Sequence, residues 1–237
     1  MLEPYKEFSK VYDKCNVSDF SAIFGESMLT YFEEKHPNDT FKTNLDICCG
    51  TGVLCNYFKS QNISSKGIDI SEGMIKKAKE NFPEIDFICE DAATYKDTVK
   101  YDFITCTDDA INHITDKNIL KRIFNNIHKS LRDGGLFVFD IDDYGHIVNK
   151  SYAKSVDDNH MLKYTISKTK EGLISTHVMY YENDELKITT DVFEKDYSIE
   201  EIEELLNETG FEMEICSKDF YDSKENHKWK IVSRARP

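Results

Sequence analysis

An acidic residue stands just before a glycine-rich turn in this chain. The segment from Asn44 to Gly52 reads Asn-Leu-Asp-Ile-Cys-Cys-Gly-Thr-Gly, in which a short apolar stretch runs past Asp46 into Gly50 and Gly52. A tight turn between a strand and a helix receives nucleotide-like cofactors in α/β proteins. Asp46 would repel a phosphate and attract an ammonium or a sulfonium, so the turn favours a cationic ligand without phosphate. S-adenosylmethionine has both properties.

Two further acidic residues follow the next two apolar stretches of the sequence. Asp69, followed by Ile70, ends the first of them, where an acid can accept hydrogen bonds from both ribose hydroxyls. An acid at this place indicates an adenosine ribose, which S-adenosylmethionine and NAD both contain. The third position of a G-x-G-x-x-G turn is Cys55 rather than glycine, which weakens the NAD alternative. Asp91 follows the next stretch in the same way.

A polar segment from Cys106 to His113 follows the fourth apolar stretch and reads Cys-Thr-Asp-Asp-Ala-Ile-Asn-His. Ligands of open α/β sheets lie at the carboxyl ends of the strands, so we expect this segment to face the reactive part of the ligand. His113 is a candidate proton acceptor, because a free imidazole titrates near about 6.5. A histidine that only packs or hydrogen-bonds at a helix start is the alternative.

Strand-like and helix-like stretches alternate in the part of the chain that carries these residues. Such alternation predicts a parallel sheet covered by helices on both faces. Gly134 and Gly135 are expected to end the last of these helices, which has the clearest apolar stripe. The expected helices are 20–32, 53–61, 73–81 and 119–131, and the expected strands are 45–48, 66–70, 85–89, 102–106 and 136–141.

The pattern changes to antiparallel strands after residue 150. Three runs rich in Thr, Tyr, Val and Ile occupy about 160–194, with hairpin turns expected at 170–172 and 183–184. One face of these strands could line a substrate pocket, but the sequence does not assign which face. The alternating side chains are those of Tyr164, His177, Met179, Tyr180 and Tyr181.

The C-terminal part returns to the main domain. Ser198 and Glu201 match a capping box, which predicts a helix that ends at Gly210. Two last strands, near 211–216 and 229–235, are expected to form a closing hairpin across a polar loop. We therefore predict one main domain from residues 1–150 and 195–237, and an antiparallel insertion at 151–194 that acts as a lid over the substrate.

Composition limits the partners of the chain. Its 237 residues carry a formal net charge of -14, which argues against nucleic acid as a partner. The sequence shows no membrane-spanning stretch and no leader segment, so a cytoplasmic location is expected. Seven cysteines without a C-x-x-C pair are expected to be reduced. An acidic run, Asp140, Asp142 and Asp143, could be considered for magnesium, but its nearly consecutive residues favour an ordinary acidic turn, and no metal is predicted.

Five motifs in sequence order resemble the class I S-adenosylmethionine-dependent methyltransferases. The resemblance spans about residues 40–141. It implies a Rossmann-like α/β fold with a seven-stranded, mostly parallel sheet whose last strand is antiparallel, here with a small antiparallel β insertion. The motifs are Leu-Asp-Ile-Cys-Cys-Gly-Thr-Gly at 45–52, Gly-Ile-Asp-Ile-Ser-Glu-Gly-Met at 67–74, Cys-Glu-Asp-Ala at 89–92, Tyr-Asp-Phe-Ile at 101–104 and Leu-Arg-Asp-Gly-Gly at 131–135.

The resemblance also implies roles for single residues. Asp46 and the turn after it would hold the methionine end, although Cys48 stands where the family usually has glycine. Tyr12 matches a tyrosine that closes over the cofactor in relatives. The residues so predicted to bind the cofactor are Tyr12, Asp46, Cys48, Gly50, Gly52, Asp69, Ile70, Met74, Asp91, Ala92, Cys106 and Asp108, and the predicted catalytic residues are His113, Asp108 and Tyr12.

Three functions remain open at this point. The first is methyl transfer from S-adenosylmethionine to the nitrogen or oxygen of a small molecule, with an amine slightly favoured by the acidic composition. The second is an NAD-dependent oxidoreductase of the Rossmann type. The third is a non-catalytic module that binds S-adenosylmethionine. The sequence does not determine the acceptor or the oligomeric state.

Overall fold

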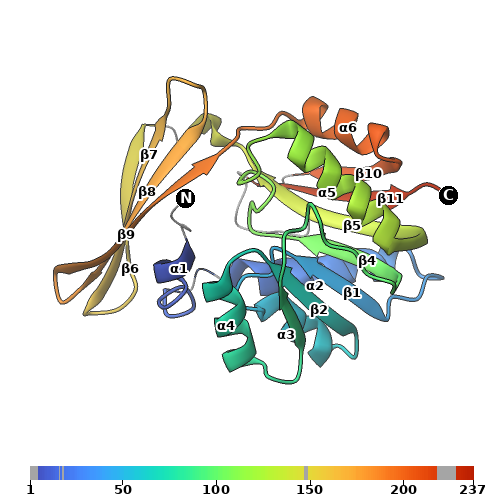
Figure 1. Ribbon diagram of the computed structural model, residues 1–237, viewed down its shortest axis with the longest axis horizontal. Helices are drawn as coiled ribbons and strands as arrows, with labels where there is room; N and C mark the ends of the chain where they lie inside the picture. The colour runs from blue at the N-terminus through green and yellow to red at the C-terminus, as the bar shows by residue number, and fades with distance from the viewer. Residues whose placement is uncertain (1–4, 16, 18, 147–148, 218–227) are drawn as a thin grey trace.

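Two β-sheets organise the computed structural model, which describes residues 5–15, 17, 19–146, 149–217 and 228–237 (Figure 1). The larger sheet has seven strands in the order β10-β11-β5-β4-β1-β2-β3. Strand β11 runs antiparallel to both of its neighbours, β5 and β10, and the other neighbouring pairs are parallel. This confirms the predicted sheet. Its strands are β1 (Thr43–Ile47), β2 (Ser64–Asp69), β3 (Asp86–Cys89), β4 (Tyr101–Cys106), β5 (Leu131–Asp142), β10 (Phe211–Ser217) and β11 (Lys228–Ala235).

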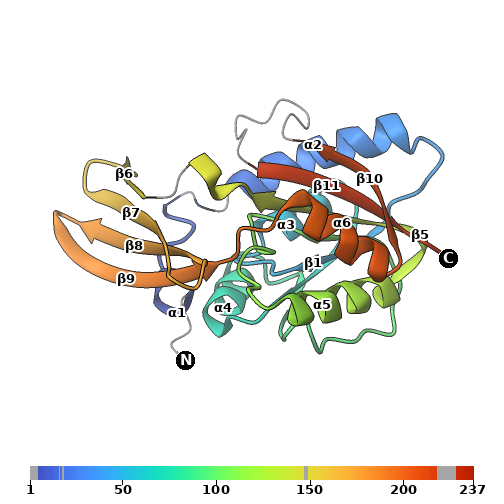
Figure 2. The ribbon, with the colours of Figure 1, turned by 90° about the horizontal axis from the view of Figure 1, so that it is seen from above.

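Helices cover both faces of the larger sheet, with α2 and α5 on opposite sides of it (Figure 2). Apolar side chains of α2 and α3 pack with Phe103 and Leu136 on one face, and those of α5 and α6 pack with Phe137 and Phe139 on the other. The sheet is therefore buried on both sides, as a parallel sheet requires. The helices are α1 (Tyr5–Phe8), α2 (Asp19–Lys35), α3 (Val53–Ser60), α4 (Glu72–Asn81), α5 (Lys117–Ser130) and α6 (Ile199–Glu208).

The smaller sheet, called the lid below, has four antiparallel strands in the order β6-β7-β8-β9 and lies at one end of the molecule (Figure 1). Its strands are β6 (Lys150–Ser155), β7 (His160–Lys168), β8 (Ile174–Glu182) and β9 (Glu185–Glu194). Asn183 and Asp184 have φ angles of 51° and 63° and form the tight β8-β9 turn predicted there. Strand β6 was not predicted, because all six of its residues are exposed and leave no apolar alternation to read.

The N-terminal segment connects the lid to the main domain. Phe8 and Cys15 are buried against Leu162, Val178 and Tyr180 of the lid. Helix α1 also contacts α4 and β9. The segment thus lies between the lid and the helices that follow β1 and β2, which places its tyrosines beside any ligand bound at the ends of those strands.

The structure corrects one predicted boundary and confirms one cap. Helix α5 ends at Ser130, and strand β5 begins at Leu131 rather than after Gly134 and Gly135. The two glycines lie where the β4-β5 register shifts between Tyr101 and Phe103, so an irregular strand absorbs them. Ser198 and Glu201 form the predicted capping box. The loop predicted between the last two strands falls mainly on 218–227, outside the described residues. Within the described part, none of the helices has the length and apolar character needed to cross a bilayer.

Candidate functional site

A cavity of about 580 Å³ lies at the carboxyl ends of β1, β2, β3 and β4. Each strand end contributes at least one acid to its wall: Asp46 from β1, Asp69 from β2, Glu90 and Asp91 after β3, and Asp108 after β4. Strands β1 and β4 are neighbours, and the chain continues from them toward opposite edges of the sheet. The cavity therefore occupies the topological switch point, where open α/β sheets bind ligands.

The glycine-rich turn after β1 needs left-handed backbone at three places. Cys48, Gly50 and Gly52 have φ angles of 57°, 53° and 84°. A Cβ atom added to Gly50 would meet nothing within 4 Å, so this backbone borders the open cavity. A Cβ atom on Gly52 would collide with the ring of Phe87, whose Cε1 would be 2.8 Å away. Gly50 thus lets a ligand approach the backbone, whereas Gly52 permits packing behind the turn.

Asp69 fixes the shape of the cavity by hydrogen bonds to two backbone segments. Its Oδ2 accepts a hydrogen bond of 3.0 Å from the amide of Gly50, and its Oδ1 accepts one of 2.8 Å from the amide of Ser71. Ser71 in turn caps α4, because its hydroxyl accepts a hydrogen bond of 3.3 Å from the amide of Met74. One carboxylate therefore couples the turn after β1 to the start of α4, and Met74 lies buried in the cavity wall.

Asp46 is buried, with a relative exposure of only 1%. Its Oδ1 accepts a hydrogen bond of 2.7 Å from the hydroxyl of Thr105, and the thiol of Cys55 lies 3.7 Å from Oδ2. Burial raises the pKa of Asp46 to about 7 despite these hydrogen bonds. A cation bound beside Asp46 would stabilise its ionised form.

The electrostatic character of the cavity is strongly acidic. Among the described residues that line it, none is Lys or Arg. A ligand with a pyrophosphate would meet carboxylates and no counter-charge, whereas a ligand with ammonium or sulfonium groups would be attracted. The cavity therefore fits S-adenosylmethionine better than a dinucleotide. Its acidic lining residues are Asp46, Asp69, Glu90, Asp91, Asp108 and Asp116.

Two tyrosines of the N-terminal segment, Tyr5 and Tyr12, line the cavity. The hydroxyl of Tyr12 donates a hydrogen bond of 3.0 Å to Oδ2 of Asp108, and the hydroxyl of Tyr5 lies 3.1 Å from Nε2 of His113. Burial raises the pKa of both phenols well above the usual value of 10.0, so both hydroxyls stay protonated. The predicted catalytic residues Tyr12, Asp108 and His113 thus lie together in the wall of the cavity.

A second cavity of about 230 Å³ lies between the lid and the main domain. It shares Tyr5, Tyr12, Asp108 and His113 with the first cavity, so these four side chains lie where the two cavities adjoin. The remaining wall is largely aliphatic and aromatic. On the lid side the wall is formed by Tyr164, Ile166, Thr176, Val178, Val192 and Glu194.

This second cavity settles which lid face is internal. Tyr164 and Tyr180 lie on the inner face, where Tyr164 lines the cavity and Tyr180 is buried against the N-terminal segment. His177 points outward, because its side chain is 41% exposed and pairs with Asp191 at 2.7 Å. Met179 shares the outer face with His177, since side chains alternate along a strand.

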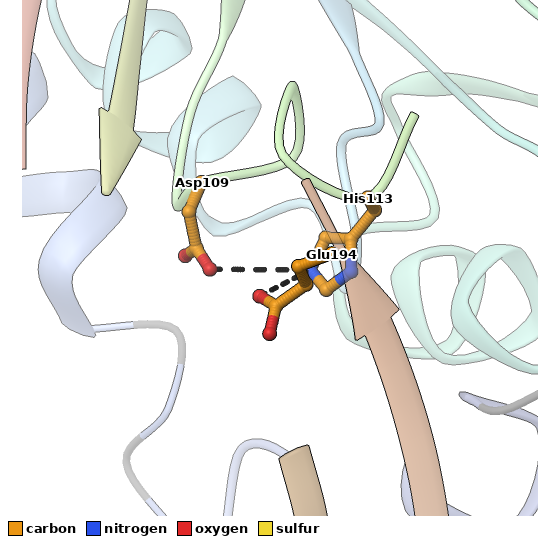
Figure 3. Close-up of side chains that lie close together, drawn as sticks. All are labelled: Asp109, His113 and Glu194. Atoms are coloured by element: carbon orange, nitrogen blue, oxygen red, sulfur yellow. Dashed lines mark ion pairs between the residues drawn. The ribbon is translucent and has the colours of Figure 1, made fainter. Parts of the chain in front are cut away.

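A cluster of charged side chains lies where the two cavities meet (Figure 3). Nε2 of His113 lies 3.8 Å from Oε1 of Glu194 and 4.0 Å from Oδ2 of Asp109. The buried ammonium of Lys228, on β11, lies 2.8 Å from Oδ1 of Asp109 and 3.1 Å from Oδ1 of Asp108. The sequence did not identify Glu194 or Lys228 as parts of the site.

The acidic run considered for magnesium serves another purpose. Asp140 accepts hydrogen bonds of 2.7 Å and 2.9 Å from the amides of Asp108 and Asp109, and Lys228 lies 3.5 Å away. It therefore shapes the loop after β4. Within the described chain, the three side chains whose ligand atoms converge are instead Asp109, His113 and Glu194.

Most of the predicted cofactor residues meet in the first cavity. Two do not line it: Gly52, which packs against Phe87, and Cys106, which is fully buried. A hydrogen bond with Cys48, together with burial, raises the pKa of the Cys106 thiol, so this group stays protonated. The predicted residues that line the cavity are Tyr12, Asp46, Cys48, Gly50, Asp69, Ile70, Met74, Asp91, Ala92 and Asp108.

Comparison with known sequences identifies a methyltransferase domain over residues 45–135. The chain is 25% identical over 142 residues to a candidate methyltransferase of Geobacillus sp. (strain WCH70), covering 58% of this chain and 57% of that protein. It is 26% identical over 96 residues to a dTDP-4-amino-2,3,4,6-tetradeoxy-D-glucose N,N-dimethyltransferase of Saccharopolyspora spinosa, covering 40% of this chain and 39% of that protein. The chain thus spans little more than half the length of the first relative and less of the second.

Comparison with solved structures shows the same fold. An S-adenosylmethionine-dependent methyltransferase from Clostridium acetobutylicum ATCC 824 has a TM-score of 0.83 at 22% identity and covers 98% of this chain and 99% of its own. CalS10, an amino pentose methyltransferase from Micromonospora echinaspora solved with its methyl donor bound, has a TM-score of 0.73 at 15% identity, covering 92% and 90%. At these identities the likeness establishes the fold.

Proposed function

We propose that this protein transfers a methyl group to the nitrogen of a small-molecule amine. Its residues 45–135 match a methyltransferase domain, and the chain has the fold of the class I S-adenosylmethionine-dependent methyltransferases. Its cofactor is S-adenosylmethionine, as the sequence predicted. One observation carries the proposal: the cofactor cavity and the neighbouring lid cavity are both acidic and meet at Tyr5, Tyr12, Asp108 and His113.

The lid cavity supports a small acceptor with an apolar body and a cationic end. Its volume is about 230 Å³, and Tyr164, Ile166 and Val178 form an apolar wall opposite the acidic end. An amine that is protonated in water would be attracted to Asp109 and Glu194. The named activities of the amino pentose and amino sugar methyltransferases, which resemble this chain, agree with an amine acceptor. A malonyl-[acyl-carrier protein] O-methyltransferase of Ilyobacter polytropus, 33% identical over 100 residues, keeps an oxygen acceptor as the second candidate.

The residues of the site divide the work of such a transfer. Asp46 would face the ammonium of the methionine arm, Asp69 the ribose hydroxyls and Asp91 the adenine amine. S-adenosylmethionine supplies a methyl group already activated by its sulfonium, so the protein has chiefly to align the acceptor and exclude water. Tyr5 and Tyr12, which line both cavities, would help to exclude water from the reacting groups. Nε2 of His113 is the group that would take a proton from the acceptor nitrogen.

The proposal is tested by incubating the protein with S-adenosylmethionine and matched pairs of small amines and alcohols, with formation of S-adenosylhomocysteine as the measured product. We expect product with amines and little or none with the alcohols of the same carbon skeleton. Binding of NADH in place of S-adenosylhomocysteine would support the oxidoreductase instead. Binding of S-adenosylhomocysteine without turnover of any acceptor would support the non-catalytic module.

Cofactor binding should depend on pH through Asp46. Its pKa of about 7 lies above that of an unfolded aspartate, so the free carboxyl is largely protonated near about pH 6 and ionised near about pH 8. A cationic methionine arm favours the ionised form, so binding should release a proton at the lower pH and tighten as pH rises through about 7. The stability of the free protein changes in the opposite direction to the affinity: Asp46 lowers the free energy of unfolding as pH rises from about 4 to about 7.

Isothermal titration calorimetry with S-adenosylhomocysteine in two buffers of different ionisation enthalpy would measure this proton release. The Asp46→Asn variant is the control, because its amide cannot titrate. Equal affinity at both pH values, with no buffer-dependent heat in the wild type, would show that Asp46 is not beside the ammonium.

A further inference from the structure

Glu194, the last residue of lid strand β9, presents a buried carboxylate to the junction of the two cavities. Its relative exposure is 4%, and burial together with the nearby Asp109 raises the pKa of Glu194 above its usual value, so a cation bound here would stabilise the ionised form. The hydroxyl of Tyr144 donates a hydrogen bond of 2.6 Å to Oε1, and the hydroxyl of Thr176 donates one of 2.9 Å to Oε2. Two donors on separate elements therefore fix the orientation of this carboxylate, and Oε1 faces His113 at 3.8 Å.

The backbone beside Glu194 is tied to the segment that carries His113. The amide of Lys195 donates a hydrogen bond of 2.8 Å to the carbonyl of Asn112, and the side-chain amide of Asn112 donates one of 2.9 Å to the carbonyl of Lys195. Asn112 is fully buried and also accepts a hydrogen bond of 3.0 Å from the amide of Asp142. The end of the lid and the loop after β4 thus form one rigid joint, which holds Glu194 in register with His113.

Lys228 leaves part of the negative charge at this joint available. Its ammonium lies 2.8 Å from Oδ1 of Asp109, whereas Oδ2 of the same carboxylate faces Nε2 of His113 at 4.0 Å. Three polar atoms therefore converge on one point of the lid cavity: Oδ2 of Asp109, Nε2 of His113 and Oε1 of Glu194 (Figure 3). Two of them are acceptors on carboxyl groups, and the third accepts a hydrogen bond when the imidazole is neutral. An ammonium group has the three N–H donors that match them.

We propose that Glu194 and Asp109 bind the ammonium group of the methyl acceptor against His113, so that a residue of the lid sets the preference for an amine over an alcohol. This inference rests on the proposed function and deepens it by naming the group that reads the acceptor. The acceptor class is a primary amine on an apolar body, which the tyrosine and aliphatic wall of the cavity accommodates.

The three atoms also provide a route for the proton that a bound ammonium must lose. One N–H bond of the ammonium breaks and an Nε2–H bond forms on neutral His113, displacing the contact from Tyr5. The nitrogen keeps the electron pair and uses it to form the N–CH3 bond, while the S–CH3 bond breaks and its electron pair stays on sulfur. The new positive charge on His113 is then stabilised by Glu194 and Asp109. An alcohol would bring neither a charge for Glu194 nor three donors for the cluster.

The experiment measures binding to the protein saturated with S-adenosylhomocysteine, by calorimetry, with benzylamine and benzyl alcohol as an isosteric pair. We expect the wild type to prefer benzylamine. In Glu194→Gln the affinity for benzylamine should fall by about 10- to 100-fold, because a hydrogen bond to a charged group is lost. The affinities for benzyl alcohol and S-adenosylhomocysteine should stay within about twofold. If benzylamine is methylated, its KM should rise more than kcat falls.

Two further variants keep the test decisive. Glu185→Gln is the matched control, since this glutamate lies on the same strand, its side chain is 74% exposed, and it forms an ion pair of 2.6 Å with Lys187. It should leave all three affinities unchanged. Glu194→Asp retains the charge and should recover part of the preference for benzylamine. It also replaces Glu194→Gln if that variant loses S-adenosylhomocysteine binding and melts early.

Several results would overturn the inference. One is an unchanged affinity for benzylamine in Glu194→Gln. Others are equal binding of amine and alcohol by the wild type, or no binding of benzylamine. Binding that EDTA abolishes and a divalent cation restores would make the cluster a metal site. The proposed function fails separately. Benzylamine that binds through Glu194 without methylation of any amine would contradict the function alone, and methylation that is indifferent to Glu194→Gln would contradict the inference alone.

Discussion

Replacing Asp69 by alanine should lower the affinity for S-adenosylhomocysteine by at least about 100-fold. The carboxylate stands at the end of β2 in the wall of the cofactor cavity, where it would accept two hydrogen bonds from the ribose, each worth about 1.5 to 3 kcal/mol when charge-assisted. It also holds the amides of Gly50 and Ser71 at 3.0 Å and 2.8 Å. The variant therefore loses both the ligand contacts and the hydrogen bonds that shape the turn.

Calorimetric titration would measure this loss, with thermal unfolding as a check on the fold. Asp86→Ala is the matched control, because Asp86 begins the neighbouring strand β3 with a side chain that is 65% exposed and pairs with Lys66 at 3.3 Å. Asp69→Asn should fall between the wild type and Asp69→Ala, since the amide keeps one acceptor. Unchanged affinity in Asp69→Ala would place the ribose elsewhere and remove the main support for the predicted cofactor position.

The cofactor half of the site could be predicted because its signals are local in sequence. Asp46, Asp69 and Asp91 each follow an apolar stretch, and parallel strands bring their carboxyl ends to one edge of the sheet. A mostly parallel sheet covered by helices on both faces follows from the alternation of strands and helices, and the structure confirms it. Each acid lies within a few residues of its own strand, and this local position is enough to predict that it lines the cofactor cavity, without knowledge of contacts between distant residues.

The acceptor half depends on contacts between residues far apart in sequence, which no local pattern reveals. In the sequence, Glu194 resembles an ordinary polar residue at the end of a lid strand, and Lys228 resembles an ordinary exposed lysine at the start of β11. Only the pairing of β11 with β5 carries Lys228 to Asp140 and Asp142, and only the joint at Asn112 carries Glu194 to His113. Strand β6 was missed for a related reason, since pairing with β7 rather than burial of its own side chains defines it.

Replacing Lys228 by methionine should destabilise the protein by about 3 to 5 kcal/mol, the usual cost of removing one partner from a buried charge cluster. Lys228 is 5% exposed, and its ammonium lies between 2.8 Å and 3.8 Å from four carboxyl groups. Those carboxyl groups hold the pKa of Lys228 well above its usual 10.5, so its contribution is present in full below that pH and is lost only at higher pH. The acids concerned are Asp108, Asp109, Asp140 and Asp142.

The pH dependence of this loss separates a charge effect from a packing effect. Burial already raises the pKa of Asp140 to about 6 and that of Asp142 to about 9, so these groups lower stability as pH rises from about 4 through those values. In Lys228→Met the pKa values of Asp140 and Asp142 should rise further, because the positive charge of Lys228, which lowers both, is gone. Urea unfolding should therefore show a larger deficit for Lys228→Met near about pH 8 than near about pH 6.

Lys187→Met, which removes an exposed lysine from the lid, should change stability by less than about 0.5 kcal/mol at either pH. A deficit for Lys228→Met that is independent of pH would mean that lost packing against Phe20, whose ring centre lies 4.5 Å from the ammonium, outweighs the charges.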